Sequence, residues 1–357
     1  MGRKDFKMEL KSKSRVPGLD IIRSLAAFSV VAVHFYLNCG YYQTPMSGTK
    51  MFIMTFVRWA LLWAVPFFMM LTGYLKCNKT VSLEHYLSLL PILVAYVSIT
   101  VIKVIVSNHF YGKIYFFKDT IKGIANYSFA WYVSMYICMI LLIPFLNILW
   151  KGLKSDREKI ILILSLIFIC SLPTVIPYLV PAYLQTLYPV MYYYIGVFIR
   201  EKKPEYNKLL LTLIVFIMAL INSLASYIGA KGGFFDWNVL SKVDSGYQAF
   251  PLVIGSVAAF LIFYDIDVKN TVVRRLFELI SGVSFEIYMF TGVFDAVIYS
   301  IAYRYIAKDA NLFFWYFFIF VPLNFILSIL ASKLYRLLYD QVSKGVIKLM
   351  KKKENDK

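Results

Sequence analysis

Histidine, cysteine and charged residues are all scarce in this 357-residue sequence. It contains three histidines and four cysteines, with no Cys-x-x-Cys pair, so no set of zinc ligands is expected. Charged residues make up 16% of the sequence, whereas a soluble domain has about 25%. The net charge is +18, but the basic residues lie in short breaks between apolar runs and form no nucleic-acid-binding motif. Neither a metal-centred protein nor a nucleic-acid partner is therefore expected.

Apolar residues dominate instead, at 60% of the sequence, and the mean hydropathy is +0.66. We expect ten segments long and apolar enough to span a membrane: 19–37, 51–75, 86–107, 129–150, 159–177, 186–200, 208–229, 247–265, 280–303 and 312–338. The predicted fold is all-α, a polytopic membrane bundle of about ten transmembrane helices. The run that opens it contains Asp20 and Arg23, so it is not expected to be a cleaved signal peptide.

The distribution of positive charge predicts the orientation of these helices. With the N-terminus in the cytoplasm, the cytoplasmic segments hold 27 of the 38 lysines and arginines, and the opposite loops hold eight. Because cytoplasmic loops carry the excess of positive charge, both termini are expected in the cytoplasm. The chain then divides into a basic N-terminus (1–18), a transmembrane domain (19–338) and a basic tail (339–357), with basic segments placed to meet membrane lipid.

Asp20, Arg23 and His34 form a line of ionisable residues in the first span. Asp20 and Arg23 are neighbours at helical spacing, and His34 lies on the same stripe, roughly 16 Å from Arg23. A charged side chain at the centre of a bilayer costs about 2.5–3.5 kcal/mol on insertion scales, so this stripe must face protein or a water-filled cavity. It is the first candidate for a functional site. Asp20 and Arg23 serve either as a structural ion pair or in positioning a donor or substrate.

The most specific local motif is Arg15-Val-Pro-Gly-Leu-Asp-Ile-Ile-Arg23, with His34 eleven residues later. It resembles the opening signature of the acyltransferase-3 family, integral membrane enzymes that O-acylate bacterial surface sugars. Four further stretches are similar to family positions along nearly the whole chain: Pro66–Leu75, Ala130–Val133 with Pro144, Tyr194–Gly196 with Arg200, and Ser284–Tyr288.

The resemblance implies a multi-pass enzyme of the bacterial cell membrane. It would be a membrane O-acetyltransferase that moves an acyl group, expected to be acetyl, from cytoplasmic acyl-CoA to a hydroxyl of a surface polysaccharide or lipid-linked glycan. Acetyl-CoA would be a donor substrate, and no bound cofactor is implied. The family usually carries arginines before a proline early in the third helix, but residues 85–91 contain none. Lys76 and Lys79 are the nearby cations that could bind the donor instead.

Each candidate site residue has a chemical reason and a structural alternative. His34 falls inside a span and suits general-base chemistry near neutral pH, acting with Arg23 and Asp20 as the catalytic set. Trp131 and Tyr132 would stack on a sugar or belong to the interfacial aromatic belt. The remaining substrate-binding candidates are Arg58, Tyr74 and Glu286.

Three further residues in the expected spans have structural roles as their expected or alternative roles. Glu286 is expected to pair with Arg58 or Arg23, while Asp295 lies toward the outer end of the ninth span and would reach solvent. Gly73, next to Tyr74, favours close helix packing.

Two other functional classes fit parts of the pattern. A transporter or flippase of a glycan or lipid-linked intermediate would also have many spans with charged residues inside them. It would more typically show glycine- or proline-broken helices in two corresponding halves, and no such repeat is present. A catalytically inactive relative is the third possibility, against which the complete set of Asp20, Arg23 and His34 argues.

Overall fold

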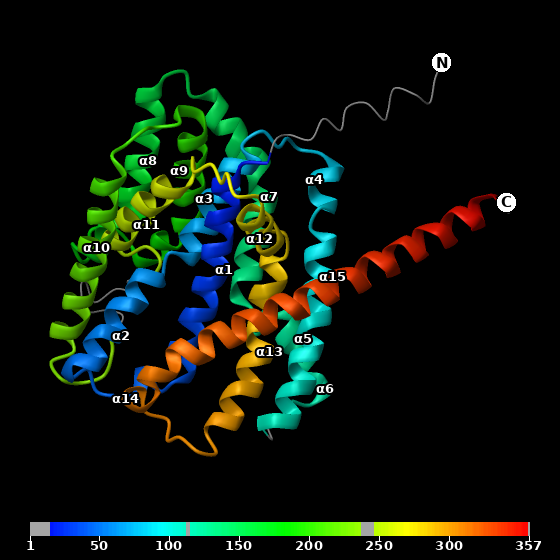
Figure 1. Ribbon diagram of the computed structural model, residues 1–357. Coiled ribbons are helices and arrows are strands. Elements are labelled where there is room, and N and C mark those ends of the chain that lie inside the picture. The colour runs from blue at the N-terminus through cyan, green and yellow to red at the C-terminus, as the bar shows by residue number, and fades with distance from the viewer. Residues whose placement is uncertain (1–14, 112–114, 237–245, 356–357) are drawn as a thin grey trace.

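The structure is a computed structural model that describes residues 15–111, 115–236 and 246–355, with only the backbone described for 111 and 344–355 (Figure 1). Every regular element in these residues is helical, and they contain no strand. The α-helices are α1 Pro17–Asn38, α2 Gly48–Leu61, α3 Ala64–Lys76, α4 Leu83–Leu87, α5 Leu90–Tyr111, α6 Phe117–Ala125, α7 Trp131–Gly152, α8 Asp156–Cys170, α9 Tyr188–Lys202, α10 Lys208–Gly229, α11 Phe250–Phe263, α12 Thr271–Gly282, α13 Ser284–Ala302, α14 Ala310–Phe313 and α15 Phe317–Asn355.

The all-helical membrane bundle predicted from the sequence is confirmed. Seven stretches of the described chain are long and apolar enough to cross a membrane: Pro17–Gln43, Gly48–Lys76, Leu83–Phe110, Trp131–Gly152, Lys208–Gly229, Ser284–Ala302 and Ala310–Ser343. The other three expected segments coincide with the shorter helices α8, α9 and α11. The count of ten spans and the cytoplasmic termini stay predictions, and the basic residues at 1–14 and 356–357 lie outside the described residues.

Residues that favour helix starts are found where several helices begin. Pro17 opens α1 at a position where its missing N–H costs no helical hydrogen bond. Asn207 and Asn270 cap α10 and α12 by accepting two backbone N–H bonds each. In Figure 1, α4 and the start of α1 lie toward the top, while α6 and α14 lie toward the bottom. The helices therefore connect two opposite ends of the bundle.

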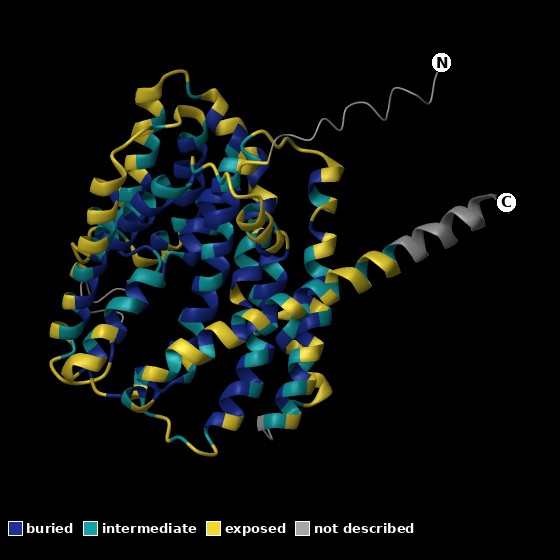
Figure 2. Cartoon of the chain, in the orientation of Figure 1, coloured by how far each residue is buried: buried dark blue, intermediate teal, exposed yellow. Residues whose placement is uncertain are grey.

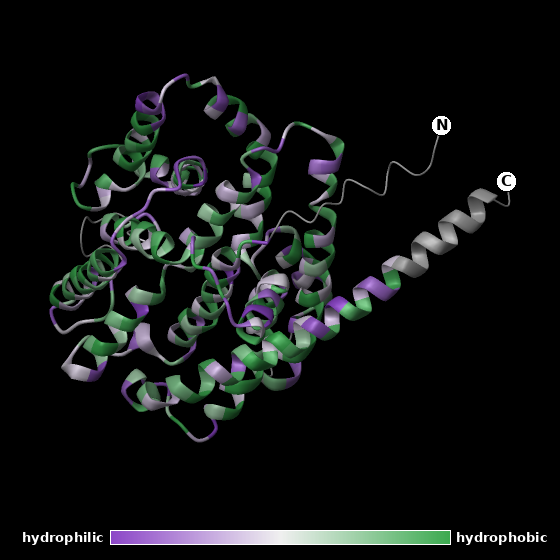
Figure 3. Cartoon of the chain, turned by 45° about the horizontal axis from the view of Figure 1, so that its top comes forward, coloured by the Kyte–Doolittle hydropathy of each residue, from purple (hydrophilic) through white to green (hydrophobic). Residues whose placement is uncertain are grey.

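Helix α1 lies inside the bundle, in contact with α2, α3, α11, α12, α13 and α15. Its small residues permit this, because Ala26, Ala27 and Ala32 are completely buried against neighbouring helices. Figure 2 shows the dark blue of buried residues along α1 and yellow on the outer helices. The outer faces are apolar, as the green surfaces of α10 and α15 show in Figure 3, which is the arrangement expected in lipid. The ionisable stripe on α1 is therefore enclosed by protein.

Two glycines let α3 and α9 cross in close contact. A Cβ atom added at Gly73 would lie 2.0 Å from the carbonyl oxygen of Tyr193, and one added at Gly196 would lie 2.0 Å from that of Met70. Any larger residue at either position would push the backbones apart. The packing role expected for Gly73 is confirmed, and the close crossing fixes the wall of the bundle that carries Thr72 and Lys76.

Candidate active site

Asp20 organises the first turn of α1 through a chain of hydrogen bonds. Arg15 forms a bidentate ion pair with its carboxylate, with distances of 2.6 and 2.9 Å. Ser281, at the end of α12, donates a hydrogen bond of 2.6 Å to the same carboxylate and accepts one of 3.2 Å from Arg23 Nη1. Arg15 lies just before the first span, and its ion pair with Asp20 raises the pKa of its guanidinium.

The structural alternative for Asp20 and Arg23, a direct ion pair between them, is therefore wrong. Asp20 is held by Arg15, which is five residues away and outside the regular helix, so helical spacing alone could not reveal the pairing. Ser281 stands between the two charges and aligns the guanidinium of Arg23. Asp20 therefore contacts Arg23 only through Ser281, and the guanidinium of Arg23 lines the space in front of it.

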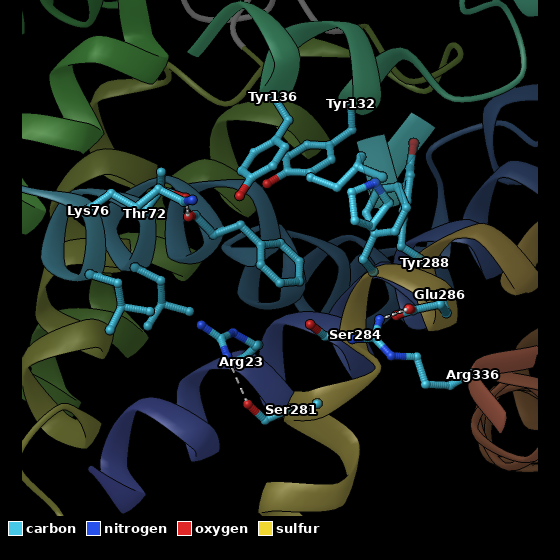
Figure 4. Close-up of a pocket in the computed structure, with 17 residues that line it drawn as sticks. Arg23, Thr72, Lys76, Tyr132, Tyr136, Ser281, Ser284, Glu286, Tyr288 and Arg336 are labelled. Carbon is cyan, nitrogen blue, oxygen red and sulfur yellow. Dashed lines mark hydrogen bonds and ion pairs between the residues drawn. The ribbon is translucent and has the colours of Figure 1, made fainter. Parts of the chain in front are cut away.

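Arg23 points into a cavity of about 270 Å³, here named the Arg23 cavity (Figure 4). Helices α1, α3, α5, α7, α12, α13 and α15 all contribute to its wall. Its polar and charged lining residues are Arg23, Thr72, Lys76, Tyr132, Tyr136, Ser281, Ser284, Glu286, Tyr288 and Arg336. Pro91 also lines the cavity, so Lys76 stands near the proline before which the family usually has arginines. Of the two expected donor-binding lysines, the structure brings Lys76 to this cavity.

Glu286 pairs with a residue from the last long helix. Its carboxylate accepts a hydrogen bond of 2.9 Å from Arg336 Nη1, and the carboxylate is buried while Arg336 is half-exposed. The expectation that Glu286 would meet Arg58 or Arg23 is therefore wrong. Arg336 lies at the far end of an expected span, where its distance in sequence concealed the contact. The pair ties α13 to α15 at the edge of the Arg23 cavity.

Three aromatic side chains separate the Arg23 cavity from a much smaller one. Phe68, Tyr132 and Tyr288 line both spaces, and their rings are in edge or tilted contact, with centroids 5.8 Å apart for Phe68 and Tyr132 and 5.6 Å for Tyr132 and Tyr288. We name these residues the aromatic constriction. The smaller space, the middle cavity, has a volume of about 40 Å³. Its lining is Val30, Val33, His34, Leu62, Ala64, Val65, Phe68, Trp131, Tyr132, Tyr247 and Tyr288.

His34 borders the middle cavity and is held by a carboxylate from another helix. Its Nδ1 lies 3.2 Å from Asp295 Oδ2 on α13. Asn324 on α15 donates a hydrogen bond of 2.8 Å to the other carboxylate oxygen, Oδ1. With Asp295 accepting the Nδ1 proton, the second ring nitrogen, Nε2, is the basic one. The expectation that Asp295 reaches solvent is wrong, because this residue is 8% exposed and oriented by two partners.

Beyond His34 lies a third space of about 370 Å³, here named the Lys103 cavity. Its lining combines cations with hydrogen-bonding groups: His34, Leu37, Asn38, Lys103, Ser107, Tyr115, Gly292, Asp295, Ala296, Tyr303 and Lys308. His34 belongs to both the middle cavity and this one. The three cavities thus form a series, in which neighbouring spaces share wall residues and His34 lies between the second and the third.

Three of the expected site residues lie away from this series of cavities. Arg58 is completely buried, with its guanidinium among aromatic rings, the nearest being that of Phe235 at 4.5 Å. Tyr74 packs against Arg200, which also donates a hydrogen bond to its carbonyl oxygen. Lys79 is exposed in the loop after α3. Trp131 and Tyr132 do reach the middle cavity, where Trp131 stacks on Tyr247.

Sequence reasoning missed Asp295, Ser281 and Tyr288 as site residues. Asp295 carried a usable signal, because a carboxylate within a span is costly unless it has a partner. Ser281 lies in the last turn of the amphipathic helix α12, which was not expected from the sequence. Tyr288 belongs to a motif that had been noted only for its similarity to the family. In each case the partner lies more than 100 residues away.

Comparison with protein families agrees with this architecture. A family model described as an acyltransferase domain, of the acyltransferase-3 type, matches residues 16–333, which include α1 to α14 and the first part of α15. Curated proteins and solved structures give no match. The match includes every residue of the three cavities except Arg336. The chain therefore belongs to the acyltransferase-3 family and is a multi-pass membrane acyltransferase.

Proposed function

We propose that this protein transfers an acetyl group from acetyl-CoA to a hydroxyl of a surface or lipid-linked glycan, with His34 as the general base. The observation that carries the proposal is the position of His34 between the middle cavity and the Lys103 cavity, with Nδ1 held by Asp295. A base at the junction of two spaces can act on a donor that enters from one and an acceptor that enters from the other.

The Arg23 cavity is the donor entrance in this proposal. Acyl-CoA is polyanionic, and Arg23 and Lys76 offer two positive charges that form no ion pair with any carboxylate in the described residues. Thr72 and Tyr136 add hydroxyl groups to the same wall. The thioester end of the donor would then extend past the aromatic constriction toward His34. In the bacterial cell membrane, this entrance would face the cytoplasm, as the distribution of positive charge predicts.

The size of the middle cavity supports acetyl as the transferred group. Each water molecule requires about 10–15 Å³ of such space, so about 40 Å³ accommodates a two-carbon acyl group and excludes a long chain. Val30, Val33 and Val65 belong to the apolar part of its wall. An acetyl group in this space would lie beside His34.

The proposed reaction uses His34 as follows. The acceptor hydroxyl, in the Lys103 cavity, gives its proton to Nε2 as its oxygen attacks the thioester carbonyl. The bond between that carbonyl and the sulfur breaks, and the leaving thiolate takes the proton from the imidazolium. Asp295 keeps the ring oriented and stabilises its positive charge, while Asn324 fixes the carboxylate. No further cofactor is needed.

A transporter is the alternative, since the three cavities also follow one another between the two ends of the bundle. The middle cavity disfavours it, because a space of about 40 Å³ behind three aromatic rings is too narrow for a sugar. A transporter would also not require the proton-accepting nitrogen of a histidine held by a carboxylate.

The test is acyl transfer from labelled acetyl-CoA to glycan in membranes that contain wild-type or variant protein. His34→Ala is expected to lower the rate by about 10²- to 10⁴-fold, the usual effect of removing a general base. His109→Ala is the matched control, because His109 is an exposed histidine at the end of α5 and lines none of the three cavities. Near-normal transfer by a well-folded His34→Ala protein would refute the role of His34. Wild-type membranes that export glycan without acylating it would favour the transporter.

A further inference from the structure

Lys103 is a cation in the middle of an otherwise apolar membrane helix. Lys103 lies on α5, and its partly buried side chain reaches the end of the loop before α7. The ammonium Nζ lies 3.5 Å from the carbonyl oxygen of Phe129 and 5.9 Å from the centre of that ring. In the part of the chain that the structure describes, no carboxylate is within ion-pair distance of it. A charge in such a position is costly and commonly marks a functional site.

The backbone of α13 makes room for this ammonium group at Gly292. A Cβ atom at that position would lie 2.8 Å from Lys103 Nζ and 3.0 Å from Cε, so the end of the lysine would have to move. The end of the lysine therefore passes over the glycine and lines the Lys103 cavity with Asp295 and His34. Lys103 thus lines the same space as the proposed base.

The nearest carboxylate in that space is already engaged. Asp295 accepts from His34 on one oxygen and from Asn324 on the other, and Asn324 is fixed in turn by Ser328 at 2.9 Å. Lys308, exposed in the loop after α13, brings a second positive charge to the cavity. Two lysines against one carboxylate leave the cavity with a surplus of positive charge next to His34.

From this arrangement we infer that the acceptor carries an anionic group, a carboxylate or a phosphate, which binds Lys103 and Lys308 while a neighbouring hydroxyl meets His34. The inference rests on the proposed function, because it concerns the acceptor of that reaction. Lys103 and Lys308 are specificity-determining residues in it: they select a charged saccharide and fix which of its hydroxyls lies at the base. A neutral sugar would leave the ammonium of Lys103 without a partner of opposite charge.

The experiment compares matched acceptors and matched lysine variants. The acceptors are methyl glucoside and methyl galactoside, their uronates, and the corresponding hexose 1-phosphates, so that the carboxylate and phosphate sources are separated. The variants are Lys103→Met and Lys308→Met, which keep the apolar stems. Lys118→Met is the control, since Lys118 is an exposed lysine on α6 that lines none of the three cavities. Transfer from acetyl-CoA and binding of each saccharide to purified protein are both measured.

Wild-type protein is expected to favour one charged class over its neutral counterpart by about 10- to 100-fold in kcat/KM, the range of a hydrogen bond to a charged group. Lys103→Met should remove this preference by raising the KM for the charged acceptor, with the KM for acetyl-CoA unchanged. Lys308→Met should weaken it, and Lys118→Met should leave it intact. Equal use of charged and neutral acceptors by wild type, or an equal loss for both in Lys103→Met, overturns the inference.

The binding measurement separates this inference from the proposed function. Binding of a charged saccharide that depends on Lys103, without any transfer, supports the anionic site and contradicts the acetyltransferase. Transfer without charge preference supports the acetyltransferase and contradicts the anionic site. If the protein shows no binding and no transfer, both the anionic site and the acetyltransferase are contradicted.

Discussion

His34 on α1 and Asp295 on α13 are 261 residues apart in sequence, and their Nδ1 and Oδ2 atoms are 3.2 Å apart in the structure. Asn324 joins them from α15, so three helices determine the orientation of one imidazole. A carboxylate that accepts from Nδ1 selects the tautomer with a basic Nε2. The pair is therefore the part of the site in which small chemical changes should have the largest effect.

Replacing Asp295 by asparagine should impair catalysis more than folding. The amide has nearly the same shape but cannot stabilise a positive imidazole, and it can donate to Nδ1, which favours the wrong tautomer. We expect kcat to fall by at least about 10²-fold, with the KM for acetyl-CoA and the thermal stability in detergent little changed. Asp267→Asn, in an exposed loop, is the control. Wild-type kcat in Asp295→Asn would mean that the carboxylate does not orient His34.

The structure separates two lysines that the sequence had grouped. Lys76 lines the Arg23 cavity and Lys79 does not, although both lie near the end of α3. Lys76→Met should raise the KM for acetyl-CoA by several-fold and reduce its dependence on salt, because a charge facing the polyanionic donor is removed. Lys79→Met should have little effect on either quantity. Steady-state kinetics at two ionic strengths measure both, and equal effects of the two changes would place the donor elsewhere.

Enlarging the middle cavity should change the choice of acyl group. Val65 is buried and lines that cavity, so Val65→Ala should increase the use of propionyl-CoA and butyryl-CoA relative to acetyl-CoA. Val253→Ala removes the same two carbons from a buried site on α11 that is not part of the three cavities. The two variants should lose similar stability, since each leaves a small void. An unchanged preference in Val65→Ala would show that the middle cavity does not hold the acyl group.

The orientation in the membrane can be tested with single cysteines. The four native cysteines, Cys39, Cys77, Cys138 and Cys170, are all free and are first replaced. Cysteines at Lys50 and Lys231 should then react with an impermeant thiol reagent in intact cells. Those at Lys154 and Lys269 should react only after the cells are opened, because their loops are predicted to be cytoplasmic. Labelling of Lys154 from outside would contradict the predicted topology.

The positions of the helices were largely predictable because hydropathy is a local property. All ten expected segments coincide with helices, although 51–75 is divided into α2 and α3 by a turn near Leu62. Helices α6 and α12 were missed because they are short and amphipathic, with charged residues such as Arg274 on one face. A window that averages hydropathy cannot detect them.

The partners of the charged residues were much less predictable. Helical spacing correctly placed Asp20, Arg23 and His34 on one helix, but the ion pairs depend on which helices lie side by side. Arg15 reaches Asp20 from outside the helix, and Arg336 reaches Glu286 from 50 residues away. Such contacts depend on how all the helices of the bundle pack together. The spacing of residues within one segment does not reveal that packing.

The aromatic constriction has a consequence for the electrical properties of the membrane. A living membrane holds an ion gradient, and an uninterrupted column of water through a protein would dissipate it. Phe68, Tyr132 and Tyr288 stand between the Arg23 cavity and a middle cavity that has room for only about three water molecules. An acyl group on the narrow thioester end of the donor can pass between the rings. A hydrated ion cannot, because it would first have to lose most of its water, which is energetically costly. The same three rings would thus prevent ions from leaking through the protein while an acyl group is transferred across the membrane.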